Sequence, residues 1–557
     1  MARAPAMLAR LFRSLFAKRR AAQPAAREVL HAEAGVRALL DEAARLGNQG
    51  KTGEATARLR EVLAREPTNA EARHTLGVLA QWANRHEEAL DHFVAAIDAP
   101  GAEAHPLYPL FLANRGRLHV WFGDLDRGFA DLDRAIRLKT DLAFAHSVRL
   151  MASQYRPGLD PVATRELHRT WAALFADPHT PAAPMQSGAR DRGRRLKVGY
   201  VSPDFRRHSV AWFFEPLLAH RDAARFEVIL YSSSASTDEV SARLRAQADG
   251  WRDITALDDA AAARRIAEDG IDLLVDLAGH TSGNRLGVFA RRPAPVQITV
   301  LGYPATTGMR AMDYRLSDAR VDPPGASDAH YTERLIRLPR CLWCFRAPLS
   351  PPVGPLPALK NGFVTFGSFN NVGKLSDACL ALWAGALKAV PRSRLLIAGA
   401  ESWETRLRIQ ERFDELGIDG ARIAFEGKRD YAGFLALRDA VDIALDSTPF
   451  GGATTTCDSL WMGVPVLALV GDRCASRACY SILHSAGLED WASADAAAFA
   501  AAAAARAADL PALATLRAGL RAQVAASPLC DEAGFARETE AAYLAAWRTW
   551  CTGGGAA

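Results

Sequence analysis

The first 340 residues of this 557-residue chain contain no cysteine, and all eight cysteines lie at or after Cys341. Their uneven spacing gives no disulfide framework, so we expect free thiols in a reducing compartment, the cytoplasm. Cys341 and Cys344 form one C-x-x-C pair in RCLWCF. A zinc site would need a second ligand pair at suitable spacing, and we find no convincing one. We therefore expect buried thiols near a domain junction and no metal.

Long apolar runs and an excess of one charge are also missing. No uninterrupted apolar run approaches the roughly 20 residues that a membrane-spanning helix needs. The 68 basic and 63 acidic residues give a net charge of +5, which is too balanced to indicate a nucleic-acid partner. The chain is 49% hydrophobic and 24% charged, so it is globular. Its length predicts about three or four domains.

The N-terminus is basic. Residues 1–28 carry seven Arg or Lys and a single acid, Glu28. Arg10 and Arg13 interrupt the apolar core that a secretory signal would need. We predict a basic tail over residues 1–29, and contact of an amphipathic helix with a membrane surface is the alternative. That alternative rests on apolar residues at helical spacing, namely Met7, Leu8, Leu11, Phe12, Leu15 and Phe16.

A repeat with a period of 34 residues follows, and a third copy is offset by 39. Its three copies contain Ala55, Leu59, Val62 and Pro67; Ala89, Phe93, Ala96 and Pro100; and Gly116, Gly128, Leu132 and Ala135. Small residues where paired helices cross, with a bulky residue one turn later, are typical of tetratricopeptide repeats. We predict an all-α tetratricopeptide module over residues 30–155, with a generic helical bundle as the alternative. Such arrays bind peptides or neighbouring subunits, so we expect a protein partner or a homo-oligomer.

The rest of the chain predicts two α/β lobes. Proline and glycine mark a linker over residues 156–194, and strand and helix patterns then alternate over 195–345. A proline-rich linker over 346–360 precedes a second alternating region over 361–500. Both regions are typical of Rossmann-like folds, in which ligands sit beyond the carboxyl ends of the strands. We expect residues 501–557 to form C-terminal helices, one of them bracing the first lobe, and a disordered tail.

Familiar nucleotide-binding motifs are absent. The chain has no G-x-G-x-x-G fingerprint, no P-loop and no obvious Asp-x-Asp metal clamp. Instead, the stretch GGATTTCDSLWMG at residues 451–463 follows an apolar strand. Its turn chemistry predicts a helix that begins near Thr454–Thr456 and ends at Gly463. The first turn of such a helix is a seat for a phosphate, although an ordinary helix cap explains the pattern as well.

Several long motifs resemble the O-GlcNAc transferase/SPINDLY family. They are GYVSPDFRRHSVAWFFEPLLAHRD, DLAGHTSGNRLGVFARRPAPVQITVLGYPATTGMRAMDYRLSD, FGSFNNVGKLS and DSTPFGGATTTCDSLWMGVPVLAL, within a resemblance that covers roughly residues 40–550. The family consists of tetratricopeptide-bearing, inverting glycosyltransferases that modify Ser and Thr of proteins. The resemblance implies the GT-B fold, in which two Rossmann-like lobes face each other, and a nucleotide-sugar donor without a metal cofactor.

The resemblance also assigns donor-binding residues in the second lobe. Lys374 in FNNVGK matches the lysine that contacts the donor phosphates, where a cation stabilises the leaving diphosphate. Asn371 matches a neighbouring donor-site residue, Thr454 and Thr455 match the threonines that bind the phosphates, and Asp458 matches the carboxylate that binds the ribose. Tyr431 and Phe434 lie in the segment that faces the base. Tyr431 and Phe434 are equally well explained as core aromatics.

In the first lobe, His208 matches the active-site histidine of the family, whose role is positioning. Some other group must take the proton of the attacking hydroxyl. Asp204, His280 and a donor phosphate oxygen are the candidates. Gly302 in LGYPATTG, another strand-end loop of the same lobe, is expected among the donor-binding residues.

The donor is the least determined feature. Animal-type members have a histidine just before the first of the two matching threonines, whereas this chain has Ala453. This difference and the motif DFRRHSV resemble the SPINDLY branch, whose plant members are associated with O-fucosylation from GDP-fucose. Bacterial relatives are generally taken to use UDP-GlcNAc, which we favour here. Two further alternatives are a catalytically inert scaffold and an enzyme that modifies asparagine, a glycan or a lipid-linked sugar instead of a protein hydroxyl.

Overall fold

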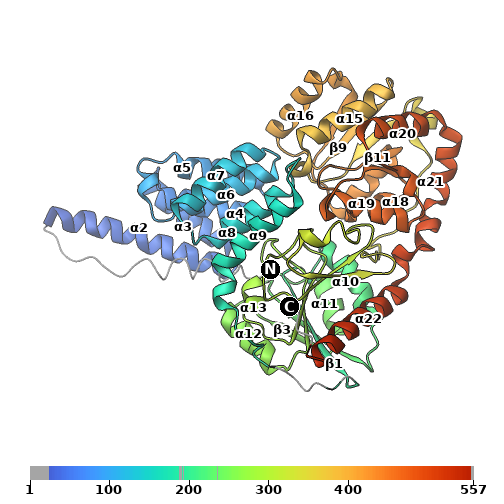
Figure 1. Ribbon diagram of the computed structural model, residues 1–557. Helices are drawn as coiled ribbons and strands as arrows, with labels where there is room; N and C mark the ends of the chain where they lie inside the picture. Colours follow the sequence, from blue (N-terminus) through green and yellow to red (C-terminus); the bar gives the residue numbers. More distant parts are fainter. Residues whose placement is uncertain (1–23, 187–190, 192, 235, 554–557) are drawn as a thin grey trace.

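The computed structural model describes residues 24–186, 191, 193–234 and 236–553. A module of antiparallel helices lies beside two α/β lobes, and the last helices of the chain run along the far side of both lobes (Figure 1). The sequence prediction of a tetratricopeptide module before two Rossmann-like lobes is confirmed. Most of the predicted basic tail lies outside the described residues, and the first described helix begins at Pro24.

Within the described residues the helical module consists of three repeat pairs and two further helices. Its elements are α2 (Pro24–Asn48), α3 (Thr52–Arg65), α4 (Ala70–Trp82), α5 (His86–Ile97), α6 (Tyr108–Trp121), α7 (Leu125–Leu138), α8 (Ala143–Ser153) and α9 (Pro161–Phe175). Apart from the exposed Pro67 and Pro100, the repeated positions of the sequence lie in the core of the module: Leu59, Phe93 and Leu132 are fully buried.

Glycine allows the paired helices to cross closely, as the repeat pattern predicts. A Cβ atom on Gly77 of α4 would lie 2.6 Å from the Phe93 ring of α5. A Cβ atom on Gly116 of α6 would lie 2.9 Å from the carbonyl oxygen of Gly128 on α7. These separations are shorter than van der Waals contact, so only glycine fits at the crossings.

Helix α9 lies inside the predicted linker over 156–194, so the interpretation of that segment as a simple linker requires correction. Asp160 caps α9 by accepting a hydrogen bond from the Ala163 amide, and Pro161 occupies the first helical position. Both features are favourable at a helix start. The proline that we took as a linker signal therefore begins a helix, and Trp171 buries that helix against the first lobe.

The N-terminal lobe contains a seven-stranded parallel sheet with the order β3-β2-β1-β4-β5-β6-β7. The strands are β1 (Leu196–Ser202), β2 (Phe226–Ser232), β3 (Gly250–Asp253), β4 (Leu273–Asp276), β5 (Val296–Thr299), β6 (Tyr314–Asp318) and β7 (Arg334–Leu338). The helices are α10 (Ser209–Ala219), α11 (Glu239–Gln247), α12 (Asp259–Glu268) and α13 (Leu286–Ala290). The strand order reverses between β1 and β4, which places a ligand-binding crevice beyond their carboxyl ends.

The C-terminal lobe repeats this design with a six-stranded parallel sheet in the order β10-β9-β8-β11-β12-β13. The strands are β8 (Thr365–Ser368), β9 (Arg394–Ala398), β10 (Ile423–Glu426), β11 (Ile443–Leu445), β12 (Val466–Leu469) and β13 (Ala492–Ser493). The helices are α14 (Pro357–Asn361), α15 (Asp377–Ala389), α16 (Trp403–Glu415), α17 (Tyr431–Ala436), α18 (Thr454–Trp461), α19 (Cys474–Ser485) and α20 (Ala496–Ala508). Here the order reverses between β8 and β11.

The last two helices, α21 (Leu510–Ala525) and α22 (Glu532–Cys551), return the chain to the first lobe (Figure 1). Tyr543 of α22 hydrogen-bonds Tyr200 of β1 through their hydroxyls at 3.2 Å, and Trp547 is fully buried. Among the described residues no single helix has the length and apolar composition to cross a membrane. Helices α20 and α21 pass that test only as a pair, and they are bent by 92°.

The crossing of α6 and α7 yields a stability test. We expect Gly116→Ala to destabilise the helical module by about 1–3 kcal/mol, because its Cβ would press on the Gly128 carbonyl. Gly53→Ala in α3 is the matched control: no atom lies within 4 Å of its Cβ, so it should be neutral or slightly stabilising. Thermal unfolding followed by circular dichroism measures both. Equal midpoints for the two variants would contradict this packing account.

Candidate functional site

Most of the residues expected to bind the donor lie at or close to the reversal point of the second sheet. The loop after β8 carries Asn371 and Lys374, and the loop after β11 leads through Gly451 into α18, which begins at Thr454. These two strands pair directly, with Ile443 opposite Phe366. Their carboxyl ends therefore bring the two loops together, although the loops are far apart in the sequence.

Lys374 extends across the gap between these loops. Its ammonium group donates a hydrogen bond to the Gly451 carbonyl at 3.1 Å and lies 4.2 Å from the centre of the Phe450 ring. Among the described residues no carboxylate forms an ion pair with it. Burial lowers the pKa of Lys374 to about 8, and the negative charge of Asp446 opposes that shift. The site thus holds a positive charge that its own protein groups only partly compensate.

Asp446 organises the loop that faces Lys374, and sequence reasoning did not select it as a site residue. Its carboxylate accepts hydrogen bonds from the Gly452 amide at 2.8 Å and from the Asn370 side chain at 3.3 Å. The Asn370 carbonyl in turn accepts a hydrogen bond from the Thr455 hydroxyl at 3.0 Å. Burial raises the pKa of Asp446, and Gly452 and Lys374 counteract the shift. The position of Asp446 directly after a buried strand was the available signal.

Helix α18 begins at Thr454 and ends at Trp461, and Gly463 follows with φ +75°, as the turn chemistry predicts. Among the described side chains none caps its first turn, because the cap position is Ala453. Thr456 is buried and donates its hydroxyl to the Gly452 carbonyl at 2.6 Å. The part-buried first turn of α18 therefore offers amide groups, the Thr454 hydroxyl and the positive end of a helix dipole on the side of the loop that contacts Lys374.

Asn371 has a structural role in this arrangement. Its side chain caps the short helix η4 (Val372–Lys374) by accepting a hydrogen bond from the Gly373 amide at 2.8 Å. The cap fixes the backbone from which Lys374 projects.

Asp458, Tyr431 and Phe434 form a second group behind α18. Asp458 is buried and accepts a hydrogen bond from the Tyr431 hydroxyl at 2.8 Å. Burial raises the pKa of Asp458, and the nearby Arg438 opposes the shift. Phe434 lies on the Arg438 guanidinium at 4.8 Å. Tyr431 also contacts Trp212 of the first lobe, with ring centres 4.8 Å apart, so this group spans the two lobes.

Asp204 and His208 lie together in the loop after β1, at the reversal point of the first sheet. The carboxylate of Asp204 is 3.6 Å from Nδ1 of His208. Nδ1 also accepts a hydrogen bond from the Val210 amide at 3.2 Å, so neutral His208 carries its proton on Nε2. Burial lowers the pKa of His208 and raises that of Asp204. His208 is thus a neutral hydrogen-bond donor that also caps α10.

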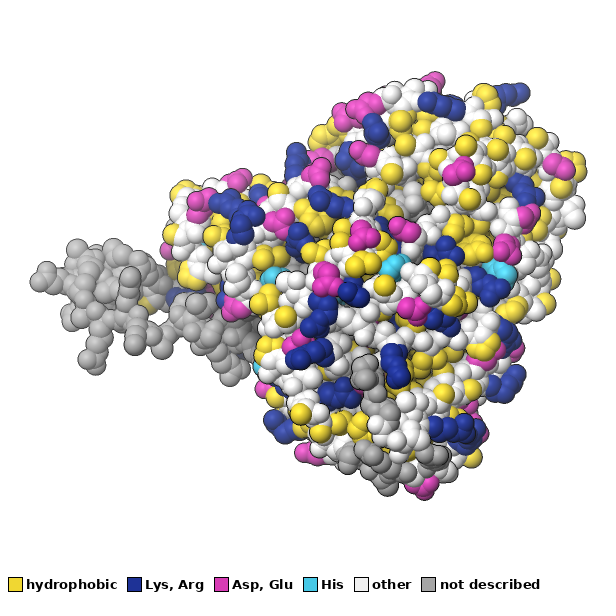
Figure 2. All heavy atoms as spheres, viewed as in Figure 1, with side chains coloured by type: hydrophobic (Ala, Val, Ile, Leu, Met, Phe, Trp, Pro, Cys, Tyr) yellow, Lys and Arg dark blue, Asp and Glu magenta, His cyan; other side chains and the backbone are white. Residues whose placement is uncertain are grey.

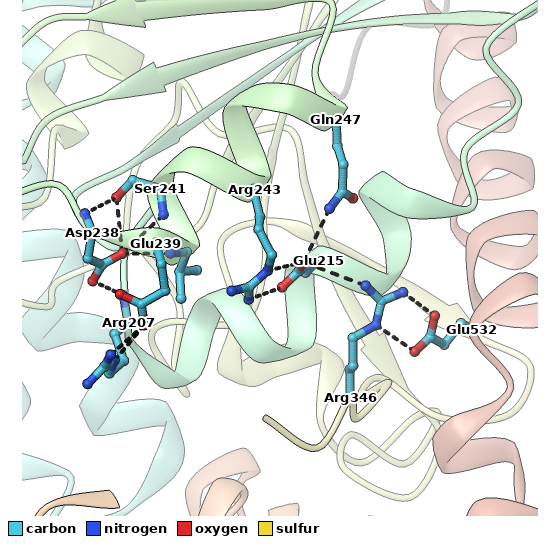
Figure 3. A network of polar contacts seen from close by, with 10 residues as sticks. Arg207, Glu215, Asp238, Glu239, Ser241, Arg243, Gln247, Arg346 and Glu532 are labelled. Atoms are coloured by element: carbon cyan, nitrogen blue, oxygen red, sulfur yellow. Dashed lines mark hydrogen bonds and ion pairs between the residues drawn. The ribbon is translucent and has the colours of Figure 1, made fainter. Parts of the chain in front are cut away.

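An ion-pair network fixes α10, which begins directly after its cap residue His208 and carries Trp212 (Figure 3). Glu215 of α10 is buried and accepts two hydrogen bonds from Arg243 of α11. Arg346, where the chain leaves the first lobe, lies 3.6 Å from Glu215 and donates to Glu532 of α22 at 2.8 Å. The network joins both connections between the lobes to the helix that presents His208.

His280 does not join the other candidates. It is 2% exposed and packs against Trp171 of α9 at 4.5 Å and against His168 at 5.1 Å. Nε2 lies 3.0 Å from the Thr307 carbonyl, and the buried Nδ1 has no hydrogen-bond partner in the part of the chain that the structure describes. Burial lowers the pKa of His280 to about 3. The motif Gly279–Thr281 at a strand end suggested chemistry, but α9 covers the ring.

Gly302 serves the backbone of the neighbouring loop. A Cβ atom on Gly302 would lie 2.2 Å from the Leu277 carbonyl oxygen, so glycine lets the loops after β4 and β5 meet.

Cys341 and Cys344 are buried free thiols near the junction of the lobes, as expected. Among the described residues no group of three or more His, Cys, Asp or Glu side chains is arranged to hold a metal ion.

Basic and acidic side chains are interspersed over the face shown in Figure 2. This distribution agrees with the small net charge of the chain.

The two doubly wound lobes define a GT-B fold. In the second lobe, a lysine and a helix N-terminus lie at the point where the strand order reverses. The chain belongs to glycosyl transferase family 41, whose model matches residues 178–345 and 357–539, and a tetratricopeptide model matches residues 48–108.

Three similar proteins illustrate this relationship. Over 430 aligned residues the chain is 38% identical to the probable UDP-N-acetylglucosamine–peptide N-acetylglucosaminyltransferase SPINDLY of Solanum lycopersicum. That alignment covers 75% of this chain and 46% of the SPINDLY protein. The chain is 28% identical over 451 residues to the protein named SEC of Arabidopsis thaliana, with the same activity in its name, covering 77% and 46%. The chain thus spans about half the length of the curated relatives that it matches. A solved structure of a mutant Thermobaculum terrenum O-GlcNAc transferase is 37% identical, with a TM-score of 0.87, covering 94% of this chain and 99% of that one.

The titration of Lys374 tests the electrostatics of the site. Asp446 raises the pKa of Lys374 against the effect of burial, so Asp446→Asn should lower it further, below about 8. The reactive neutral amine would then form at lower pH in the variant than in the wild type. Competitive reductive methylation, followed at Lys374 by peptide mass spectrometry across a pH series, measures this difference. An unchanged or raised midpoint in Asp446→Asn would contradict the assigned coupling.

Proposed function

We propose that this chain transfers a single sugar from a nucleotide donor to Ser or Thr hydroxyls of proteins, with inversion at the anomeric carbon. The observation that carries the proposal is the incompletely compensated ammonium of Lys374 beside the uncapped first turn of α18. Both features attract an anion, and they lie at the reversal point of a GT-B lobe. A nucleotide diphosphate is the anion that family membership supports.

In the proposed reaction the acceptor hydroxyl oxygen attacks the anomeric carbon while the bond from that carbon to the β-phosphate oxygen breaks. Negative charge develops on the departing diphosphate. Lys374, the Thr454 hydroxyl and the first-turn amides of α18, that of Thr455 included, stabilise that charge as it forms, which is where preorganised donors are most effective. Asn371 and Asp446 hold the two loops that carry these groups. The proposal requires no metal cofactor.

The proton of the acceptor hydroxyl passes to a base, and two of the four candidate bases are less suitable than the others. His208 accepts at Nδ1 from the Val210 amide and donates at Nε2, which suits orientation of a substrate oxygen. His280 is too deeply buried to meet a substrate. Asp204 and a donor phosphate oxygen remain as acceptors, and the raised pKa of Asp204 makes it a better base than an ordinary aspartate.

We propose UDP-GlcNAc as the donor, because the names of the relatives in both branches specify it. Protein O-fucosylation from GDP-fucose is the second candidate. It is favoured by Ala453 at the cap of α18 and by the higher identity to the SPINDLY protein, 38% against 28% for SEC. The acceptor is proposed to be a protein segment held by the repeats, with which the family model and the helical module agree.

Calorimetric titration of the wild type and Lys374→Ala with UDP-GlcNAc and GDP-fucose tests the proposal. We expect UDP-GlcNAc to bind the wild type, and the variant to bind it about 10- to 100-fold more weakly, because a hydrogen bond from a charged donor is lost. Preference for GDP-fucose would replace the proposed donor. Lys360→Ala, on exposed helix α14, is the control for removal of a lysine charge. Binding of neither donor by folded protein would favour an inert scaffold.

Transfer itself is then measured by incubating the wild type with the bound donor and a library of Ser- and Thr-containing peptides. Mass spectrometry should find one sugar per modified hydroxyl, and Lys374→Ala should give no product above background. Modification of asparagine, a glycan or a lipid instead would contradict the proposed acceptor class.

A further inference from the structure

The repeat module contacts the second lobe directly at the helix that presents Lys374. The turn between α6 and α7 contains Phe122 and Gly123, and it lies against η4 (Val372–Lys374) and α16. We propose that this turn is a structural part of the donor site: Gly123 and its neighbours hold η4 in place and so position Lys374. The inference rests on the proposed function, because it assigns a role in binding the donor diphosphate.

Two glycines make the contact a close approach of backbones. A Cβ atom on Gly373 would lie 2.6 Å from the Val120 carbonyl oxygen, at the end of α6. A Cβ atom on Gly123 would lie 2.9 Å from the Val372 carbonyl oxygen. Neither side has room for one additional carbon atom, so the turn and η4 fix each other's position. Lys374 is the next residue after Gly373.

Helix α16 anchors the same turn from a second direction. The Phe122 carbonyl accepts hydrogen bonds from the Thr405 hydroxyl at 3.1 Å and from Arg408 at 3.4 Å. Thr405 is 3% exposed, so this contact is shielded from water. Burial lowers the pKa of Arg408. The turn therefore cannot move away from η4 without exposing or unpairing these buried groups.

The repeat module also contacts Phe450, the aromatic residue beside the Lys374 ammonium. The ring of Tyr155, just after α8, lies 5.2 Å from the ring of Phe450. Phe450 is the ring against which the Lys374 ammonium rests at 4.2 Å. Arg473 of the second lobe donates to the carbonyls of Arg156 at 2.8 Å and Leu159 at 3.2 Å and so secures this contact. The module thus supports both the backbone and the ammonium of Lys374.

The variant Gly123→Ala tests the inference, and Gly101→Ala is its matched control. Both glycines lie in turns of the repeat module with positive φ, +82° and +74°, but no atom lies within 4 Å of a Cβ on Gly101. The two variants therefore share the backbone strain and differ in the contacts that a Cβ on Gly123 would make, with the Val372 carbonyl of η4 and with the Arg408 side chain of α16. We expect Gly123→Ala to bind UDP or GDP, whichever the wild type binds, about tenfold more weakly, and Gly101→Ala to match the wild type.

A double-mutant cycle shows whether the effect acts through Lys374. In a Lys374→Ala background, Gly123→Ala should cause no further loss of nucleotide affinity, because the group that it positions is absent. A loss of the same size in both backgrounds would overturn the inference, as would wild-type affinity in a folded Gly123→Ala variant. Thermal unfolding of all four proteins establishes that they are folded.

Tyr155 provides a second test that does not strain the backbone. Tyr155→Ala removes the ring that supports Phe450 and should weaken nucleotide binding, whereas Tyr155→Phe keeps the ring and should not. Equal affinities for these two variants would also count against the inference. A wild-type chain that binds neither nucleotide would instead contradict the proposed function on which the inference rests.

Discussion

The site depends on one electrostatic constraint: the part-buried Lys374 ammonium has no carboxylate ion-pair partner among the described residues. Its contacts are the Gly451 carbonyl and the Phe450 ring, and burial lowers its pKa to about 8. An ammonium so placed is costly unless an anion completes the site. The uncapped end of α18 lies nearby and favours the same kind of ligand. The fold, with loops from two paired strands meeting at a reversal point, keeps these features together.

The repeats and the lobes form one functional unit in this account. The turn after α6 presses on η4, α9 covers His280, and α22 braces β1 through Tyr543. The arrangement differs from that of a binding module joined to an enzyme by a flexible linker. If the repeats hold the acceptor, as proposed, the module that presents it also supports Lys374 through the turn after α6.

The sequence was informative where a local pattern decides the structure. Helical crossings with small residues, buried parallel strands and the boundaries of α18 follow from spacing and turn residues alone. It failed where distant segments meet. Asp446 and Asn370 are 76 residues apart, and their hydrogen bond exists only because β8 and β11 pair. His280 follows a strand as a catalytic residue would, but α9, in a segment that we took for a linker, buries it. Asp446 and His280 are both polar residues that follow a strand, and no local signal in the sequence shows that the first lies at the site and the second under α9.

Proton uptake on nucleotide binding tests the central claim most directly. A bound diphosphate should raise the pKa of Lys374 well above about 8, so slightly above pH 8 the number of protons that the wild type takes up per nucleotide should be a substantial fraction of one. Calorimetric titration with UDP or GDP, whichever binds, in buffers of different ionisation enthalpy measures this number. The account predicts that uptake in the wild type and its loss in Lys374→Ala. Binding without proton uptake, or equal uptake by the variant, would contradict the role assigned to Lys374.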